Sequence, residues 1–113
     1  MTKNKSHTIT AKLTSNWIDG NIDGFRFQAL VFDEPSTYGI NNGRISKLTI
    51  WDEIQRFLKK DIFKASIVNY DRGWDIQPLN VNDKETLRAT IEYLENLPCA
   101  TEQEEFFKKG KKD

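Results

Sequence analysis

The sequence predicts an α+β fold, in which an antiparallel meander of four to five strands is covered on one face by a C-terminal helix. Two turn signatures, Asp23-Gly24 and Asp71-Arg72-Gly73, each separate two runs of β-prone and aromatic residues. Asp-Gly in that setting favours a hairpin, because a type I′ turn requires positive φ at both central residues. Apolar residues at helical spacing over residues 83–97 predict the helix that covers the sheet.

The strands of this sheet follow from alternation and from strand breakers. They are predicted over residues 8–13, 17–22, 25–32, 44–51 and 65–70. The first alternates between apolar and polar residues, which is typical of an edge strand. The third places Phe25, Phe27 and Ala29 on one face, and it ends before Pro35 because proline cannot donate to a sheet ladder.

Helical spacing appears in three places. Behind Asp52, a usable N-cap, residues 52–60 carry Ile54, Phe57 and Leu58 at helical spacing, which predicts a short helix inserted before the last core strand. Asn82, followed three residues later by Glu85, predicts the start of the main helix. Its apolar stripe consists of Leu87, Ile91 and Leu94, and Pro98 stops it. Residues 101–109 predict a marginal last helix.

Length and composition indicate one domain over residues 1–113, with a flexible arm (1–7), the sheet and main helix (8–97), the marginal helix (101–109) and a tail (110–113). The 17 basic and 17 acidic residues cancel, so no overall field attracts nucleic acid or membrane. Cys99 is the only cysteine, which fits a reducing cytoplasm as the expected location. No apolar run approaches the ~20 residues of a membrane span, so we expect no membrane partner.

Nucleophilic catalysis finds little support in the sequence. A Ser-His or Cys-His pair requires a structured histidine, and His7, the only histidine, falls on the predicted arm. Cys99 follows Pro98 at a helix end, where a half-buried structural thiol is expected because no basic residue stands beside it in the sequence. No phosphate-binding glycine loop occurs.

Carboxylates flank both turns and are the stronger candidates for chemistry. Asp19 and Asp23 flank the first turn, and Asp71 and Asp75 flank the second. Converging carboxylates can hold Mg²⁺ or act as acid and base. Aspartate is also favoured in turns for its local hydrogen bonds, and no third ligand or metal-binding spacing is present. We therefore expect no enzyme activity, no metal and no cofactor.

Binding to another macromolecule fits the composition better. Large aromatics that stay exposed beside cations would anchor a protein, or would stack on the bases of single-stranded nucleic acid. The candidate binding residues are Tyr38, Arg44, Lys47, Trp51, Tyr70, Arg72 and Trp74. The turn carrying Arg72 and Trp74 is predicted to be the most function-bearing exposed segment. In the structural alternative, Arg72 pairs with Asp71 or Asp75 and Trp74 folds back over the sheet edge.

The charge distribution keeps a nucleic-acid alternative open. Residues 42–64 hold six basic against three acidic side chains. The cations available to phosphates in that alternative are Arg44, Lys47, Arg56, Lys59, Lys60 and Lys64, with Trp51, Tyr70 and Trp74 for stacking. The order of elements is also similar to that of Whirly-type and coactivator-type single-strand-binding proteins.

Two runs carry a resemblance to a known family. They are DGFRFQALVFDEPSTYGINNGRISKL at residues 23–48 and NYDRGWD at residues 69–75. They resemble a family of small uncharacterised proteins common in phages and mobile elements of Gram-positive bacteria, over residues 17–97. In that family the two strands on either side of residues 53–64 are joined by a short turn, so this segment is an insertion. The two runs carry no known chemistry of that family. Taken together with the lack of catalytic groups and the polarised aromatic and charged surface, the resemblance leads us to expect a non-enzymatic binding protein. We expect it to inhibit a host or defence protein by covering its surface, as anti-CRISPR proteins do.

Overall fold

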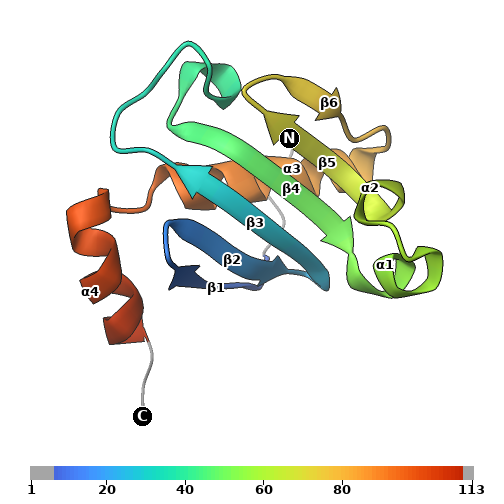
Figure 1. Ribbon diagram of the computed structural model, residues 1–113, viewed down its shortest axis with the longest axis horizontal. Helices are drawn as coiled ribbons and strands as arrows, with labels where there is room; N and C mark the ends of the chain where they lie inside the picture. The colour runs from blue at the N-terminus through green and yellow to red at the C-terminus, as the bar shows by residue number, and fades with distance from the viewer. Residues whose placement is uncertain (1–6, 111–113) are drawn as a thin grey trace, which may run out of the picture.

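A computed structural model describes residues 7–110, which form a six-stranded antiparallel open sheet with the strands in sequence order (Figure 1). The strands are β1 (Ile9–Thr14), β2 (Trp17–Ile22), β3 (Phe25–Val31), β4 (Ile45–Asp52), β5 (Ser66–Asp71) and β6 (Trp74–Ile76). The helices are α1 (Glu53–Lys59), α2 (Ile62–Ala65), α3 (Val81–Glu95) and α4 (Ala100–Gly110), with a 3₁₀ turn, η1 (Ile40–Asn42). Helix α3 crosses one face of the sheet, and the opposite face, turned toward the viewer in Figure 1, carries no helix. We call it the open face.

The α+β class and the meander are confirmed, and the sheet has one strand more than the upper limit predicted. At the first hairpin Asp23 (φ 50°) and Gly24 (φ 93°) both have positive φ, as the type I′ signature predicts. At the second, Arg72 (φ 58°) turns the chain so that Trp74 pairs with Tyr70 and β6 forms. A strand of three residues is too short to show alternation, which is why the sequence did not reveal β6.

The core lies between the sheet and α3, and its rows follow from strand register. Ile18, Ala29, Leu48 and Tyr70 form one row across β2 to β5. Gly20 pairs with Phe27 in the next row, and a Cβ atom added at Gly20 would lie 2.4 Å from Phe27 Cζ. The absence of a side chain at Gly20 therefore makes the space that the buried Phe27 ring fills.

Helix α3 begins earlier than the sequence predicts. Its N-cap is Asn80, whose side chain accepts a hydrogen bond from Asp83 N at 2.8 Å, and not Asn82. Glu85, expected to complete a capping box, instead binds Arg88 and His7. Asn80 and Asp83 form a related pair two residues upstream, in which the Asn80 side-chain Nδ2, and not the backbone N–H of a capping box, donates to Asp83 Oδ2 at 3.1 Å.

The buried side of α3 is also rotated relative to the predicted stripe. Its fully buried residues are Thr86, Ala89, Thr90 and Leu94. Leu87 and Ile91 are partly buried and pack at the margin of the core. Small side chains at the centre let the helix approach the sheet closely, and the Thr90 hydroxyl is satisfied by donating to Thr86 O at 2.7 Å.

The short helix predicted over residues 52–60 is confirmed as α1. Asp52 Oδ1 accepts hydrogen bonds from Ile54 N (2.9 Å) and Gln55 N (3.1 Å). An unpredicted second helix, α2, follows directly, with Asp61 as its N-cap. The last predicted helix is confirmed as α4, which lies beside β1 and buries Gln103.

The expectation that His7 belongs to a flexible arm is wrong. His7 Nδ1 contacts Asp23 Oδ2, and Nε2 lies 2.8 Å from Glu85 Oε2. Thr8 N donates to Asp23 Oδ1 at 2.9 Å, so the first described residues are fastened to the β2–β3 turn and to α3. Sequence spacing gave no sign of this, because the two carboxylates come from segments 62 residues apart. Residues 1–6 of the predicted arm and residues 111–113 of the predicted tail lie outside the described residues.

This contact predicts a pH-dependent contribution to stability. Hydrogen bonds to Asp23 and then Glu85 raise the pKa of His7 above its ordinary value of 6.5. The contribution is therefore fully present below pH 6.5 and is lost as pH rises through the raised pKa. The melting-temperature difference between wild type and His7→Asn, followed from about pH 5.5 to about pH 9, should be largest at the acidic end. A difference that stays constant with pH would contradict the assignment. Arg88 and His7 lower the pKa of Glu85 to about 2, so Glu85 stays charged throughout.

Candidate binding surface

One end of the open face carries a cation between an aromatic ring and a carboxylate. Lys47 pairs with Leu30 on β3 and with Asp71 on β5. Its Nζ lies 5.9 Å from the centroid of the Trp17 ring and 3.9 Å from Asp71 Oδ1. The ammonium group is thus held against the indole face by a weak cation–π contact and a partly exposed ion pair.

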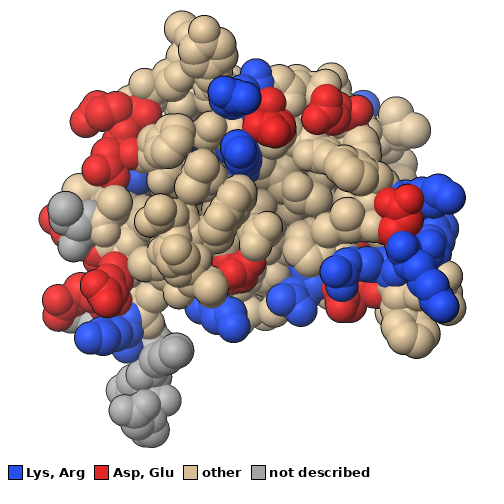
Figure 2. All heavy atoms as spheres, in the orientation of Figure 1, with Lys and Arg blue, Asp and Glu red and all other residues tan. Residues whose placement is uncertain are grey.

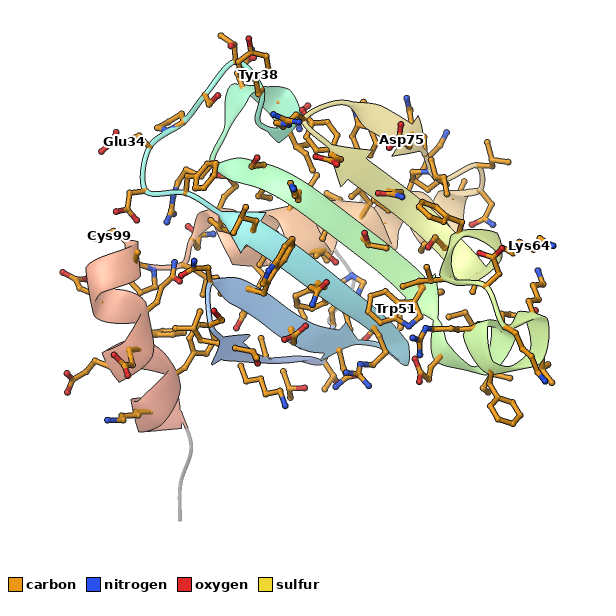
Figure 3. All side chains as sticks on the ribbon, viewed as in Figure 1. Glu34, Tyr38, Trp51, Lys64, Asp75 and Cys99 are labelled. Atoms are coloured by element: carbon orange, nitrogen blue, oxygen red, sulfur yellow. The ribbon has the colours of Figure 1, made fainter. Side chains whose placement is uncertain are left out.

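The other end of the open face pairs Arg26 with Trp51. The two residues are direct neighbours across β3 and β4, and Figure 3 shows the Trp51 side chain over the open face. Trp51 Nε1 donates to Glu53 Oε1 at 2.8 Å. Arg26 Nε is buried and has no hydrogen-bond acceptor among the residues that the structure describes. A buried donor without an acceptor costs about 1–3 kcal/mol, so a turn of the Arg26 side chain that brings Nε to an acceptor on a partner would be favoured at this point.

Between these ends the open face is polar. Gln28 Nε2 donates to Asp19 Oδ1 at 2.9 Å, and Thr49 and Asn69 continue the same row. The surface therefore combines Trp17, Trp51 and Leu30 with cations and uncharged hydrogen-bonding groups on one rigid sheet. Lys47 and Trp51 are the two sequence-predicted site residues that lie on it.

The structure corrects the expectation that Arg44 is available to a partner. Its Nη1 donates to Glu95 O (3.0 Å) and Leu97 O (2.8 Å), and its Nη2 donates to Pro98 O (3.2 Å). Its Nε donates to Phe32 O at 2.8 Å. The guanidinium group thus fastens the end of α3 to the loop after β3, and its charge also suits a helix C-terminus.

The expectation that Tyr70 offers an exposed stacking face is also wrong. Only 6% of Tyr70 is exposed, and its hydroxyl donates to Tyr38 O at 2.7 Å. The Trp74 ring meets the Tyr70 ring edge-on at 5.0 Å and 71°, and Arg72 Nε lies 3.6 Å from Asp71 Oδ1. This geometry matches the structural alternative for the turn, in which Arg72 pairs with a neighbouring aspartate and Trp74 folds back over the sheet edge. Arg72 and Tyr38 remain exposed, and Figure 3 shows Tyr38 at the far end of the loop before β4.

A second surface was missed by sequence reasoning. It is the α1–α2 tip, residues 53–65, where Ile54, Phe57, Leu58 and Phe63 are between 60% and 77% exposed and α1 buries no residue. Helical spacing at residues 54–58 indicated a helix, but it did not indicate which way its apolar side faces. Figure 2 shows blue Lys and Arg spheres gathered over this end of the molecule.

Three of the four carboxylates flanking the turns, Asp19, Asp23 and Asp71, have structural partners. Asp23 binds His7 and Thr8, Asp71 lies near Lys47 and Arg72, and Asp75 is exposed. Over residues 7–110 no three His, Cys, Asp or Glu side chains form a group able to hold a metal ion. Cys99 is half-buried, and its carbonyl accepts hydrogen bonds from Glu102 N and Gln103 N. No helix in the described part of the chain has the length and apolarity needed to cross a membrane.

A family model for a domain of unknown function, DUF7678, matches residues 16–95. The chain belongs to the DUF7678 family. The matched region runs from the start of β2 to the end of α3, so β1 and α4 are additions at either side of the DUF7678 region. Both Arg26 and Trp51, and the whole α1–α2 tip, fall inside it. No curated protein and no solved structure matches the chain.

Proposed function

We propose that this DUF7678 protein is a non-enzymatic binding protein of a phage or mobile element. It docks on a host protein, such as a component of a defence system, and inhibits it by covering its surface. The observation that carries the proposal is the buried Arg26 Nε beside Trp51 on the open face, for which residues 7–110 supply no acceptor. The family resemblance of the two sequence runs supports the phage or mobile-element origin.

The open face has the properties of a protein-binding surface. Tryptophan and arginine are the residue types most enriched at binding hot spots, and here both stand on a sheet that α3 holds rigid from behind. A standard interface needs about 800 Å² on each partner, which one face of a small sheet can supply. A carboxylate or carbonyl oxygen of the partner would satisfy Arg26 Nε, and the partner surface would dehydrate Trp17 and Trp51 together.

An affinity pull-down from a host lysate, read by mass spectrometry, tests the proposal. The wild type should recover a host protein in stoichiometric amount. The double variant Arg26→Gln/Trp51→Ala should lose it while its melting temperature stays within about 5 °C, a shift equal to about 1 kcal/mol for a chain of this size. Arg72→Ala/Trp74→Ala serves as the comparison, because it tests the turn that the sequence favoured. If Arg26→Gln/Trp51→Ala still recovers the host protein and Arg72→Ala/Trp74→Ala does not, the binding site lies at the turn and not on the open face.

Single-stranded nucleic acid is a second candidate, favoured by the contact of Lys47 with the Trp17 ring and by the cations of the α1–α2 tip. Bases would stack on Trp17 and Trp51, and phosphates would bind Lys47 and the tip cations. A gel shift with oligonucleotides, weakening as salt rises, would support this candidate. No shift at low salt with micromolar protein would remove it.

A further inference from the structure

The α1–α2 tip concentrates exposed apolar side chains beyond what a monomer surface normally shows. Four of the ten exposed large apolar side chains in the described part of the chain lie on this one segment. Isolated exposed apolar residues are common and need no explanation, but a contiguous group marks an interaction surface. The tip stands at one end of the sheet, between β4 and β5, and α4 lies at the opposite end (Figure 1).

The arrangement of these side chains does not suit a helix that docks in a groove of another protein. Ile54, Phe57 and Leu58 follow i, i+3 and i+4 spacing on one side of α1. A groove-binding helix adds an apolar anchor at i+7, and that position is Asp61. Asp61 Oδ1 instead accepts a hydrogen bond from Phe63 N at 2.9 Å and starts α2.

The exposed charged side chains of the tip are mainly basic. Its basic side chains are Arg56, Lys59, Lys60 and Lys64. Asp52 and Asp61 accept hydrogen bonds from backbone N–H groups, and Glu53 accepts one from Trp51 Nε1. Arg56 Nη1 lies 3.9 Å from Glu53 Oε2, whereas among the described residues none of the three lysines forms an ion pair with a carboxylate. The tip therefore presents apolar groups and unpaired cations together, which complements a surface that is both apolar and anionic.

We propose that the α1–α2 tip binds the surface of an anionic phospholipid bilayer. Phe57, Phe63 and the aliphatic pair enter the boundary between headgroups and acyl chains, while the lysines contact lipid phosphates. A hollow at the tip is lined by Arg56, Phe57, Lys60, Asp61 and Ile62, so the lipid phosphates are expected at the exposed lysines and not inside this hollow. The tip touches the open face at one point, where Trp51 Nε1 donates to Glu53 Oε1, but its exposed apolar side chains are not part of that face, so this inference goes beyond the proposed protein-binding function. The sequence-based expectation of no membrane partner rested on run length, which detects spanning helices and not surface contact.

Co-sedimentation with vesicles tests this proposal. Wild-type protein should sediment with vesicles of phosphatidylcholine mixed with phosphatidylglycerol, and much less with phosphatidylcholine alone. Phe57→Ser/Phe63→Ser should abolish sedimentation, since the side chains that enter the bilayer are gone. Lys59→Gln/Lys60→Gln should weaken binding to anionic vesicles by about fivefold for each lysine removed. Because α1 buries no residue and Phe63 on α2 is 60% exposed, these variants should keep the wild-type melting temperature.

Two controls separate the possible outcomes. Phe106→Ser on α4 removes a 45% exposed phenylalanine from the other end of the molecule and should leave vesicle binding unchanged. Arg26→Gln/Trp51→Ala should also bind vesicles normally, so failure of the proposed function would not affect this result. Equal sedimentation with both kinds of vesicle, or none with either, would overturn the proposal. If the Phe57/Phe63 variant instead loses a host protein or a concentration-dependent dimer, the tip serves that partner and not a bilayer.

Discussion

Replacing Arg44 by alanine should lower the free energy of unfolding by about 2–4 kcal/mol. The guanidinium group donates to four backbone carbonyls, three of which belong to the end of α3 and the residues that follow it. Its removal leaves Glu95 O, Leu97 O and Pro98 O without this donor where the chain is partly buried, and it detaches the loop after β3 from α3. Urea denaturation followed by circular dichroism measures the change.

Arg44→Lys is the matched control for this prediction. A lysine keeps the positive charge at the helix C-terminus, but its single ammonium group cannot span carbonyls on both sides of the contact. We expect it to recover less than half of the lost stability. A loss below about 0.5 kcal/mol for Arg44→Ala would show that the contact is dispensable and would reopen Arg44 as a binding residue.

Replacing Phe27 by alanine should have the largest effect of any single change discussed, about 3–5 kcal/mol. Phe27 is completely buried at the centre of the sheet, and its ring fills the space over Gly20. Truncation leaves a cavity that the strands cannot close, because β2 and β4 fix the backbone on both sides. The measurement is again equilibrium denaturation.

Phe32→Ala provides the comparison at the end of the same chain segment. Phe32 is 49% exposed, so its truncation should cost only about 0.5 kcal/mol. Similar losses for the two variants would mean that the core does not lie on the α3 side of the sheet as described.

Predictions from the sequence were accurate where structure depends on neighbouring residues. Asp23-Gly24 turns as expected because the φ requirement of the turn is met by those two residues alone. Asp52 starts α1 because its carboxylate reaches the backbone N–H groups just ahead of it. Errors in helix boundaries were small. Asn80 and not Asn82 caps α3, because both are good N-cap residues and packing selects between them.

The candidate site was predicted only in part. Lys47 and Trp51 lie on the open face, whereas Tyr70 packs against the covered face and Arg44 is occupied by carbonyls. Alternation along a strand separates residues into two groups but does not say which group α3 covers. Three of the four carbonyl partners of Arg44 lie more than 50 residues away in sequence, so no local pattern could indicate them.

The sequence by itself determined the class of fold, the first hairpin and the capped start of α1, because hydrogen bonds within a few residues dictate each of them. The tertiary structure alone decided which face of the sheet stays open and that the apolar side of α1 faces away from the core. It also decided that Arg26 Nε finds no acceptor in the described part of the chain. These features depend on which face of the sheet α3 packs against and on the space that remains after the core is filled. They are set by packing among residues distant in sequence, which periodicity along the chain does not encode.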